Sequence, residues 1–153
     1  MNTSTKNEVI FIILTGTNKG SIICDLVEKY YLAKKRIIIS IKDGEEARSF
    51  DQLLWTWKQS SFIPHRFFES LDSRPEEPVV ITSTLNESLG FDVLIMFDPV
   101  PINIMHNFSK IIDFAEKYDP NRLTKSRERY KEYMKDNFKL ETMRPGEFLS
   151  SKI

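Results

Sequence analysis

The chain has 153 residues, of which 41% are hydrophobic and 29% charged, and this fits one globular domain without room for a second. Lys plus Arg and Asp plus Glu number 22 each, so no overall positive field favours direct binding of nucleic acid. The single cysteine, Cys24, excludes an intramolecular disulfide. Because no apolar run is long enough for a signal peptide or a membrane span, we expect a cytoplasmic protein without a membrane partner.

The first third of the chain predicts a strand-helix-strand unit. Residues 1–7 are polar and are expected to form a flexible N-terminus. Val9–Leu14 is a continuous apolar, β-branched run, which indicates a strand buried on both faces. Apolar residues then recur at helical spacing between Ile22 and Tyr31, and Arg36–Ile41 is a second strand. Such a unit has a right-handed crossover and is typical of a parallel sheet.

The middle of the chain continues this alternation. A second helix is expected from Asp43, whose side chain can cap it, to about residues 55–57. An acidic, proline-containing loop follows at residues 69–78. The remaining predicted elements are an extended piece at Phe62–His65, buried strands at Val79–Thr82 and Asp92–Phe97, and an edge strand at Ile111–Phe114. The fold class expected is α/β, a single Rossmann-like domain with a mostly parallel central sheet flanked by helices.

A basic helix closes the predicted domain. Asp119 can cap it, and Pro120 suits its first turn, where a missing N–H is harmless. The helix is expected to run to Asp136, with Asn137 as a left-handed terminator. We therefore expect the domain to cover residues 8–140 and residues 141–153 to form a flexible tail.

A phosphate loop is not supported. Gly16–Ser21 lies between a predicted strand and helix, where glycine N–H groups can bind phosphate. The spacing does not match, because three residues rather than four separate Gly16 from Gly20 and Ser21 follows directly. Asp98 ends an apolar strand, as a metal-binding aspartate of a phosphoacceptor domain does, but it has no acidic partner nearby.

Other residues with catalytic chemistry also stand alone. His65 and His106 have no neighbour in the sequence that would mark a ligand or a general base, and Cys24 falls near a buried helical stripe. We therefore expect no catalytic residue, no metal and no cofactor. A nucleotide-binding or phosphoacceptor protein that uses residues 15–21 with Asp98 stays as the alternative from the enzyme class.

Positive charge gathers on the last predicted helix. Residues 117–139 contain eight Lys or Arg and four acidic residues. Their helical spacing places four of them on one face: Arg127, Tyr130, Lys131 and Met134. Arg129 points away from that face and is expected to form a surface salt bridge. From charge alone, a solvated face is the favoured interpretation, and direct binding of single-stranded nucleic acid, with Tyr130 and Tyr133 stacking on bases, is a further one.

Two sequence blocks resemble one family. Ser126–Tyr133 reads SRERYKEY, has Phe138 beyond it, and resembles a signature of the chi subunit of bacterial DNA polymerase III. Phe50–Trp55, followed by Ser61–His65, is similar to a second pattern of that family in order and spacing. The resemblance covers roughly residues 9–140. It implies a clamp-loader accessory subunit with a Rossmann-like fold that does not bind nucleotides.

The resemblance also implies partners and a site. The partners are the psi subunit of the clamp loader and the acidic C-terminal tail of single-stranded DNA-binding protein, through which nucleic acid is reached only indirectly. The implied tail site combines Arg127, Tyr130 and Lys131 with Trp55 and Phe62, and Met134 lies beside them. Trp55 and Phe62 are equally compatible with core positions.

These residue types suit a tail that ends in aspartates, proline and phenylalanine. Arg127 can hold a carboxylate with two N–H groups, and Lys131 adds a mobile charge one turn away. Trp55 and Phe62, with the Tyr130 ring, would then surround the terminal phenylalanine. The psi surface is not defined by the sequence; residues 102–108 and the predicted edge strand at residue 111 are candidates.

Overall fold

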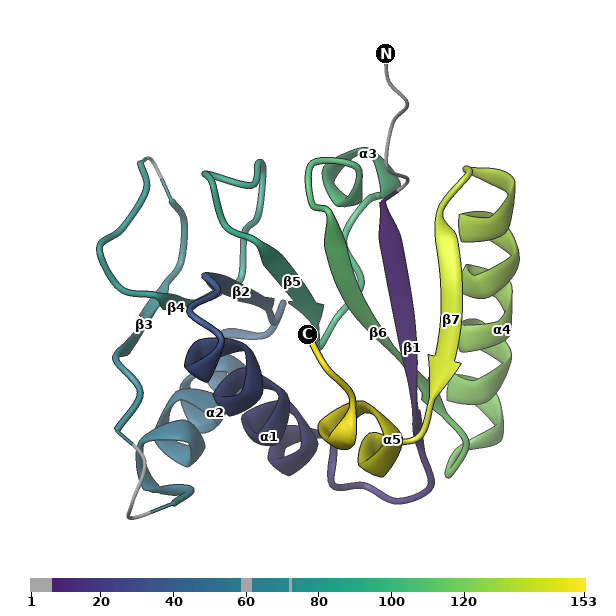
Figure 1. Cartoon of the computed structure of the whole chain (residues 1–153), viewed down its shortest axis with the longest axis horizontal. Coiled ribbons are helices and arrows are strands. Elements are labelled where there is room, and N and C mark those ends of the chain that lie inside the picture. Colours follow the sequence, from purple (N-terminus) through teal and green to yellow (C-terminus); the bar gives the residue numbers. More distant parts are fainter. Residues whose placement is uncertain (1–6, 59–61, 72) are drawn as a thin grey trace.

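The computed structural model describes residues 7–58, 62–71 and 73–153, which form one α/β unit with helices on both faces of a sheet (Figure 1). In this part of the chain the sheet has seven strands in the order β3-β4-β2-β5-β6-β1-β7, and every pair of neighbours is parallel. The strands are β1 (Glu8–Leu14), β2 (Ile37–Ser40), β3 (His65–Phe68), β4 (Val79–Thr82), β5 (Val93–Met96), β6 (Lys110–Glu116) and β7 (Lys139–Met143). The helices are α1 (Lys19–Leu32), α2 (Gly44–Thr56), α3 (Ile102–Met105), α4 (Pro120–Lys135) and α5 (Pro145–Ser150). The predicted fold class is confirmed.

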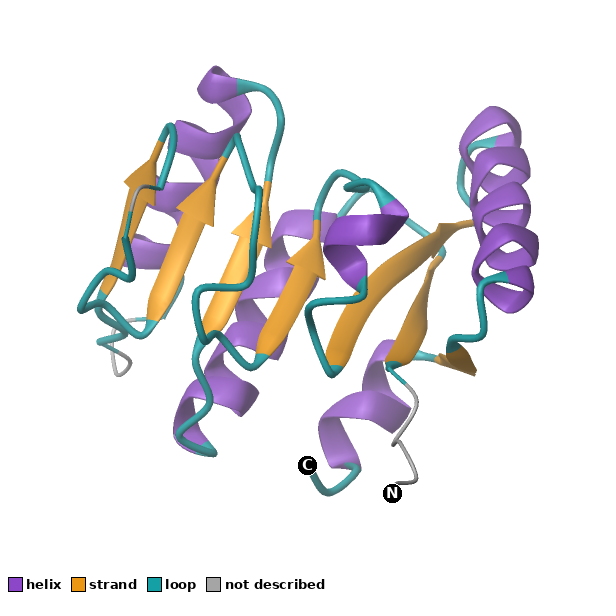
Figure 2. Cartoon of the chain, turned by 90° about the horizontal axis from the view of Figure 1, so that it is seen from above, coloured by secondary structure: helices purple, strands orange, loops and turns teal. Residues whose placement is uncertain are grey.

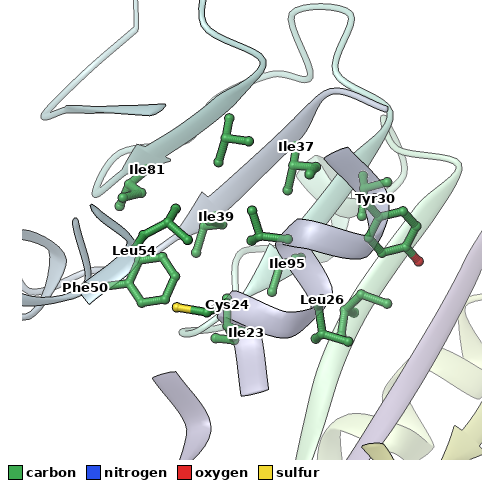
Figure 3. Packing of buried hydrophobic residues seen from close by; sticks show 14 of the residues in the cluster. Ile23, Cys24, Leu26, Tyr30, Ile37, Ile39, Phe50, Leu54, Ile81 and Ile95 are labelled. Atoms are coloured by element: carbon green, nitrogen blue, oxygen red, sulfur yellow. The ribbon is translucent and has the colours of Figure 1, made fainter. Parts of the chain in front are cut away.

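Alternation along the strands builds a separate core on each face of the sheet. Ile10 and Ile12 of β1 point to the face covered by α1, α2 and α5, whereas Val9 and Phe11 point to the face of α3 and α4. Figure 3 shows the first core, in which side chains of α1 and α2 meet those of the inner strands. Seen along the sheet in Figure 2, α4 stands at one end of it. Helix α4 is therefore on the opposite face from α1 and α2.

Two predictions about the sheet are wrong. The strand expected at the edge, residues 111–114, is the inner strand β6, which pairs with β5 and with β1. Ile111 and Ile112 point to opposite faces and are both buried, so β6 needs covering on each side. The edge strands are β3 and β7 instead. β3 begins at His65, where only the end of a short extended piece was expected.

The chain continues its ordered structure after residue 140, where the sequence predicts a tail. Strand β7 pairs with β1 over residues 139–143, and Phe148 of α5 is buried against α1, with its ring 5.7 Å from that of Tyr30. Lys29 donates hydrogen bonds to the backbone oxygens of Phe148 and Ser151. Most β7 side chains are exposed, so this segment lacks the apolar pattern that marks a strand. Residues 1–6 of the predicted N-terminal segment lie outside the described residues.

Candidate functional site

Helix α4 begins where the sequence predicts. The Asp119 side chain accepts hydrogen bonds from the backbone N–H groups of Asn121 and Arg122 at 2.9 and 3.3 Å, and Pro120 follows in the first turn. A carboxylate here satisfies N–H groups that have no partner within the helix, and it opposes the positive end of the helix dipole. Ser126 and Tyr133 are the buried residues of this helix, and most of its other side chains are exposed.

A buried carboxylate attaches α4 to the sheet. Asp113 of β6 is 1% exposed and accepts hydrogen bonds from Arg129 at 2.9 and 3.1 Å and from the Tyr133 hydroxyl at 2.9 Å. Ser126 donates to the backbone oxygen of Phe114 at 3.0 Å. Burial lowers the pKa of Arg129, but the hydrogen bonds and the charge of Asp113 outweigh this and raise it. The prediction of Arg129 as a surface residue is wrong, because the partner on β6 is distant in the sequence.

The outer side of α4 carries the four residues that the helical spacing groups together. Arg127, Lys131 and Met134 are exposed, and the half-buried Tyr130 packs its ring 5.4 Å from that of Phe11. We call these four residues, 127, 130, 131 and 134, the helix surface. Within the described residues, neither Arg127 nor Lys131 has an ion-pair partner. Their charges are therefore free to meet a ligand.

An apolar hollow of about 90 Å³ adjoins the helix surface. Its lining comes from α4, from the two inner strands beneath it and from the edge strand: Phe11, Ala115, Leu123, Ser126, Arg127, Tyr130 and Thr142. The lining is mostly apolar, and Arg127 is the charged residue that contributes to it. Sequence reasoning missed Phe11, Ala115 and Thr142, since parallel pairing brings β7, β1 and β6 side by side only in the folded chain.

Trp55 and Phe62 do not join this hollow, and the expectation that they complete it is wrong. They belong to α2 and to the residues before β3, at one edge of the sheet, whereas α4 packs on β6 and β7 at the other edge and on the opposite face (Figure 1). The separation follows from the strand order, which places five strands between β3 and β7. No spacing between sequence blocks contains that information.

The two aromatic residues instead form a second exposed surface, which we call the aromatic surface. Trp55 is 41% and Phe62 is 73% exposed, and their ring centroids are 5.5 Å apart. The buried His65 lies 4.0 Å behind Trp55 and bonds through its ring nitrogens to the backbone oxygens of Ile63 and Asp51. Neither aromatic residue is a core position, whereas Trp57 packs against the core.

The carboxyl end of the sheet holds a larger cavity, of about 430 Å³, in which Lys19, Arg122 and Glu116 pair with one another. Lys19, the first residue of α1, donates to the backbone oxygen of Phe97 and lies 3.4 Å from the buried Glu116. Glu116 also accepts from Arg122 and from the Tyr118 hydroxyl, and burial with this hydrogen bond raises the pKa of Tyr118 to about 12. Lys19 is therefore engaged by a buried carboxylate of the same chain.

Catalytic and metal chemistry find no support elsewhere in residues 7–58, 62–71 and 73–153. This part of the chain contains no group of three or more His, Cys, Asp or Glu residues that could hold a metal ion. Burial raises the pKa of the Cys24 thiol to about 12, which keeps it protonated and unreactive at neutral pH. The Asp98 side chain accepts a hydrogen bond from the backbone N–H of Lys42 and so ties the segment after β5 to the segment after β2. Among these residues, no helix is both long and apolar enough to cross a bilayer.

The fold defines an α/β protein with a parallel sheet covered by helices. Its backbone is similar to the C-terminal domain of a Dbp5 variant from S. cerevisiae, solved with a Gle1 variant and IP6, with a TM-score of 0.57 over 93% of this chain and 91% of that one. At 12% identity, this likeness concerns the fold alone.

Sequence comparisons identify the family. The chain is 29% identical to DNA polymerase III subunit chi of Haemophilus influenzae over 82% of its own length and 86% of the relative's. It is 28% identical to the same subunit of Escherichia coli over 79% and 82% of the two chains. A family model described as DNA polymerase III chi subunit, HolC, matches residues 7–141. The chain belongs to this family, and its role is that of an accessory protein in DNA replication.

Proposed function

We propose that the protein is a cytoplasmic, replisome-associated adapter that holds two partners at once. The helix surface binds the acidic, phenylalanine-ended C-terminal tail of single-stranded DNA-binding protein. The aromatic surface binds the psi subunit of the clamp loader. The observation that carries the proposal is the apolar hollow with Arg127 at it and Lys131 one turn further along α4.

The hollow and its cations fit the chemistry of such a tail. The terminal phenylalanine ring enters between Leu123, Tyr130 and Phe11, which supply apolar and aromatic contacts. Arg127 then reaches the terminal carboxylate, because the carboxylate and the ring belong to the same residue. Lys131 meets the aspartates that precede it. A disordered peptide loses conformational entropy on binding, so the affinity is expected to be micromolar, about −8 kcal/mol.

The local positive charge of residues 117–139 favours the approach of an acidic peptide to α4. The eight basic residues of 117–139 exceed the four acidic ones, although the whole chain is neutral. Three of the basic residues already have an ion-pair partner, since Arg129 pairs with Asp113, Arg122 with Glu116 and Lys139 with Glu8. Exposed cations that remain near the hollow attract an acidic tail and are screened by salt.

The aromatic surface is suited to psi rather than to an acidic peptide. Its two rings present apolar area, and buried tryptophan and other large side chains provide much of the binding energy in protein interfaces. The polar neighbours His65 and Asp51 lie 3.3 Å from one another. Because the aromatic surface and the helix surface lie at opposite edges of the sheet, one partner does not obstruct the other. Strand β6 is no longer a candidate for psi, since both its edges are paired.

Calorimetric titration of an acidic peptide ending in phenylalanine tests the helix surface. Wild type should bind it with micromolar affinity, and Lys131→Ala or removal of the terminal phenylalanine should abolish most of that affinity. Lys125→Ala is the matched control, because Lys125 is an exposed cation of α4 that does not line the apolar hollow. Equal binding by wild type and Lys131→Ala would refute the proposed site.

Bare single-stranded DNA provides the test of the competing function. The basic excess of residues 117–139 is the observation that favours direct binding. The adapter expects little shift of bare DNA in a gel at physiological salt, and a clear shift when the DNA is coated with its binding protein. A shift of bare DNA that Arg127→Ala removes would favour the direct binder.

A further inference from the structure

We propose that Asp113, Arg129 and Tyr133 are positioning residues that set the rotation of α4 about its axis. In doing so they direct Arg127, Tyr130 and Lys131 toward the apolar hollow. This inference rests on the proposed peptide site. It assigns a function to three residues that do not line the hollow and would not contact the peptide.

The geometry is that of a fixed attachment. Asp113 stands in the middle of the inner strand β6, paired across to Phe11 of β1. Its two carboxylate oxygens accept from the Nε and Nη2 atoms of Arg129, a planar two-point contact, and one of them also accepts from Tyr133. A planar guanidinium held by two bonds has a defined orientation, unlike a lysine ammonium. Tyr133, one turn further along α4, prevents the helix from pivoting about Arg129.

Apolar packing alone leaves this rotation poorly determined. Of the 16 residues of α4, the buried ones are Ser126 and Tyr133, and the former is polar. An amphipathic helix is ordinarily oriented by a broad apolar stripe, whereas the aromatic packing of α4 is narrow and comes from Tyr130 and Tyr133 against Phe11. Polar contacts on its inner side replace that stripe: Ser126 to the Phe114 oxygen, and Arg129 and Tyr133 to Asp113.

The energetics of a buried ion pair indicate that it contributes to the orientation of α4 more than to the stability of the fold. Removing two charges from water costs about as much as their attraction returns, so replacement by apolar groups of similar volume is often neutral for stability. Arg129 and Asp113 have side chains only 18% and 2% exposed, which places them in this regime. The pair therefore specifies one rotation of α4 over the others more than it stabilises the fold.

A triple variant separates orientation from stability: Asp113→Leu, Arg129→Met and Tyr133→Phe together. It removes all three polar groups, so no buried charge or hydroxyl is left without a partner. We expect a thermal midpoint within a few degrees of wild type and a peptide Kd about tenfold weaker, because α4 must be ordered on binding. The slope of log Kd against log salt should not change, since Arg127 and Lys131 are retained. A wild-type Kd at a wild-type midpoint would overturn the proposal.

Two further measurements cover the other outcomes. If the triple variant does not fold, Arg129→Lys provides the test. This variant keeps the positive charge but loses the planar two-point contact with Asp113, so we expect about threefold weaker peptide binding. Wild-type affinity of Arg129→Lys would then overturn the proposal. If wild type itself fails to bind the peptide, the proposed function fails instead. Backbone hydrogen exchange at residues 123–134 then tests the positioning, with faster exchange expected in the triple variant or in Arg129→Lys and equal exchange contradicting it.

Discussion

The helix surface and the aromatic surface are made in opposite ways. The helix surface is charged, adjoins a hollow, and lies on a helix attached to the sheet through a buried ion pair. The aromatic surface consists of two uncharged, exposed rings, and the Trp55 ring packs against the buried imidazole of His65. A hollow flanked by cations selects a short peptide with a free carboxylate, whereas exposed rings select an apolar patch on a folded or folding partner. The two surfaces should therefore differ in partner, in salt dependence and in sensitivity to mutation.

The largest effect is expected where the helix surface is attached to the sheet. Asp113→Ala leaves the guanidinium of Arg129 buried without its carboxylate, so the free energy of unfolding should fall by about 3–5 kcal/mol. Urea denaturation measures it. Asp51→Ala is the control at the aromatic end, because His65 keeps its bonds to backbone oxygens, and we expect a loss of about 1 kcal/mol or less. Equal losses would contradict the contrast between the two regions.

A second prediction separates the partners. Trp55→Ala removes a large ring from the aromatic surface, so the affinity for psi should fall by about 2 kcal/mol, or roughly 30-fold. The affinity for the acidic peptide should not change, because Trp55 lies at the other edge of the sheet. Surface plasmon resonance with immobilised psi and with immobilised peptide measures both. A parallel loss of the two affinities would show that the surfaces are not independent.

Salt should distinguish the surfaces without any mutation. Screening weakens contacts between exposed charges, so the peptide Kd should rise by about tenfold between low and moderately high salt. The Kd for psi should change by less than about twofold, since burial of apolar area depends little on ionic strength. Titrations of both partners across a salt series measure this. A steep salt dependence for psi would indicate that charged residues contribute to its interface.

The smallest expected effect concerns one hydroxyl. Within the described residues, the Tyr130 side chain contributes its ring to the hollow and to Phe11, and no hydrogen bond of its hydroxyl is seen. Tyr130→Phe should therefore change peptide affinity by no more than about 0.5 kcal/mol, whereas Tyr130→Ala should cost about 1–2 kcal/mol. Calorimetry resolves the pair. A loss with Tyr130→Phe as large as that with Tyr130→Ala would assign the hydroxyl a contact with the peptide.

Features that depend on neighbouring residues were predictable from the sequence. The buried strand at 9–14, the caps Asp43 and Asp119, and the shared face of Arg127 and Lys131 all follow from local pattern, and the structure contains each of them. Local pattern also predicts that α4 is largely solvated, as it is.

Features that depend on strand order were not predictable. The inner position of β6 and the separation of Trp55 from α4 arise from how distant strands pair. The Arg129 contact with Asp113 joins α4 to β6, and the sequence around either residue does not indicate the other as its partner. Strand β7 is mostly exposed and polar, so it lacks the alternation that identifies strands. The apolar hollow could not be predicted for the same reason. Its lining comes from β1, β6, α4 and β7, which lie side by side only in the folded chain.

The pairing of β1 has a consequence for how the protein is made. Both neighbours of this apolar strand, β6 and β7, are synthesised about a hundred residues after it. Val9–Leu14 therefore leaves the ribosome early, with both edges open until β6 has emerged and with one edge open until residue 143 has emerged. An unpaired β-branched segment of this kind is a nucleus for aggregation. Synthesis that stalls before residue 110 should thus yield chains that depend on chaperones, although the finished protein buries most of this strand.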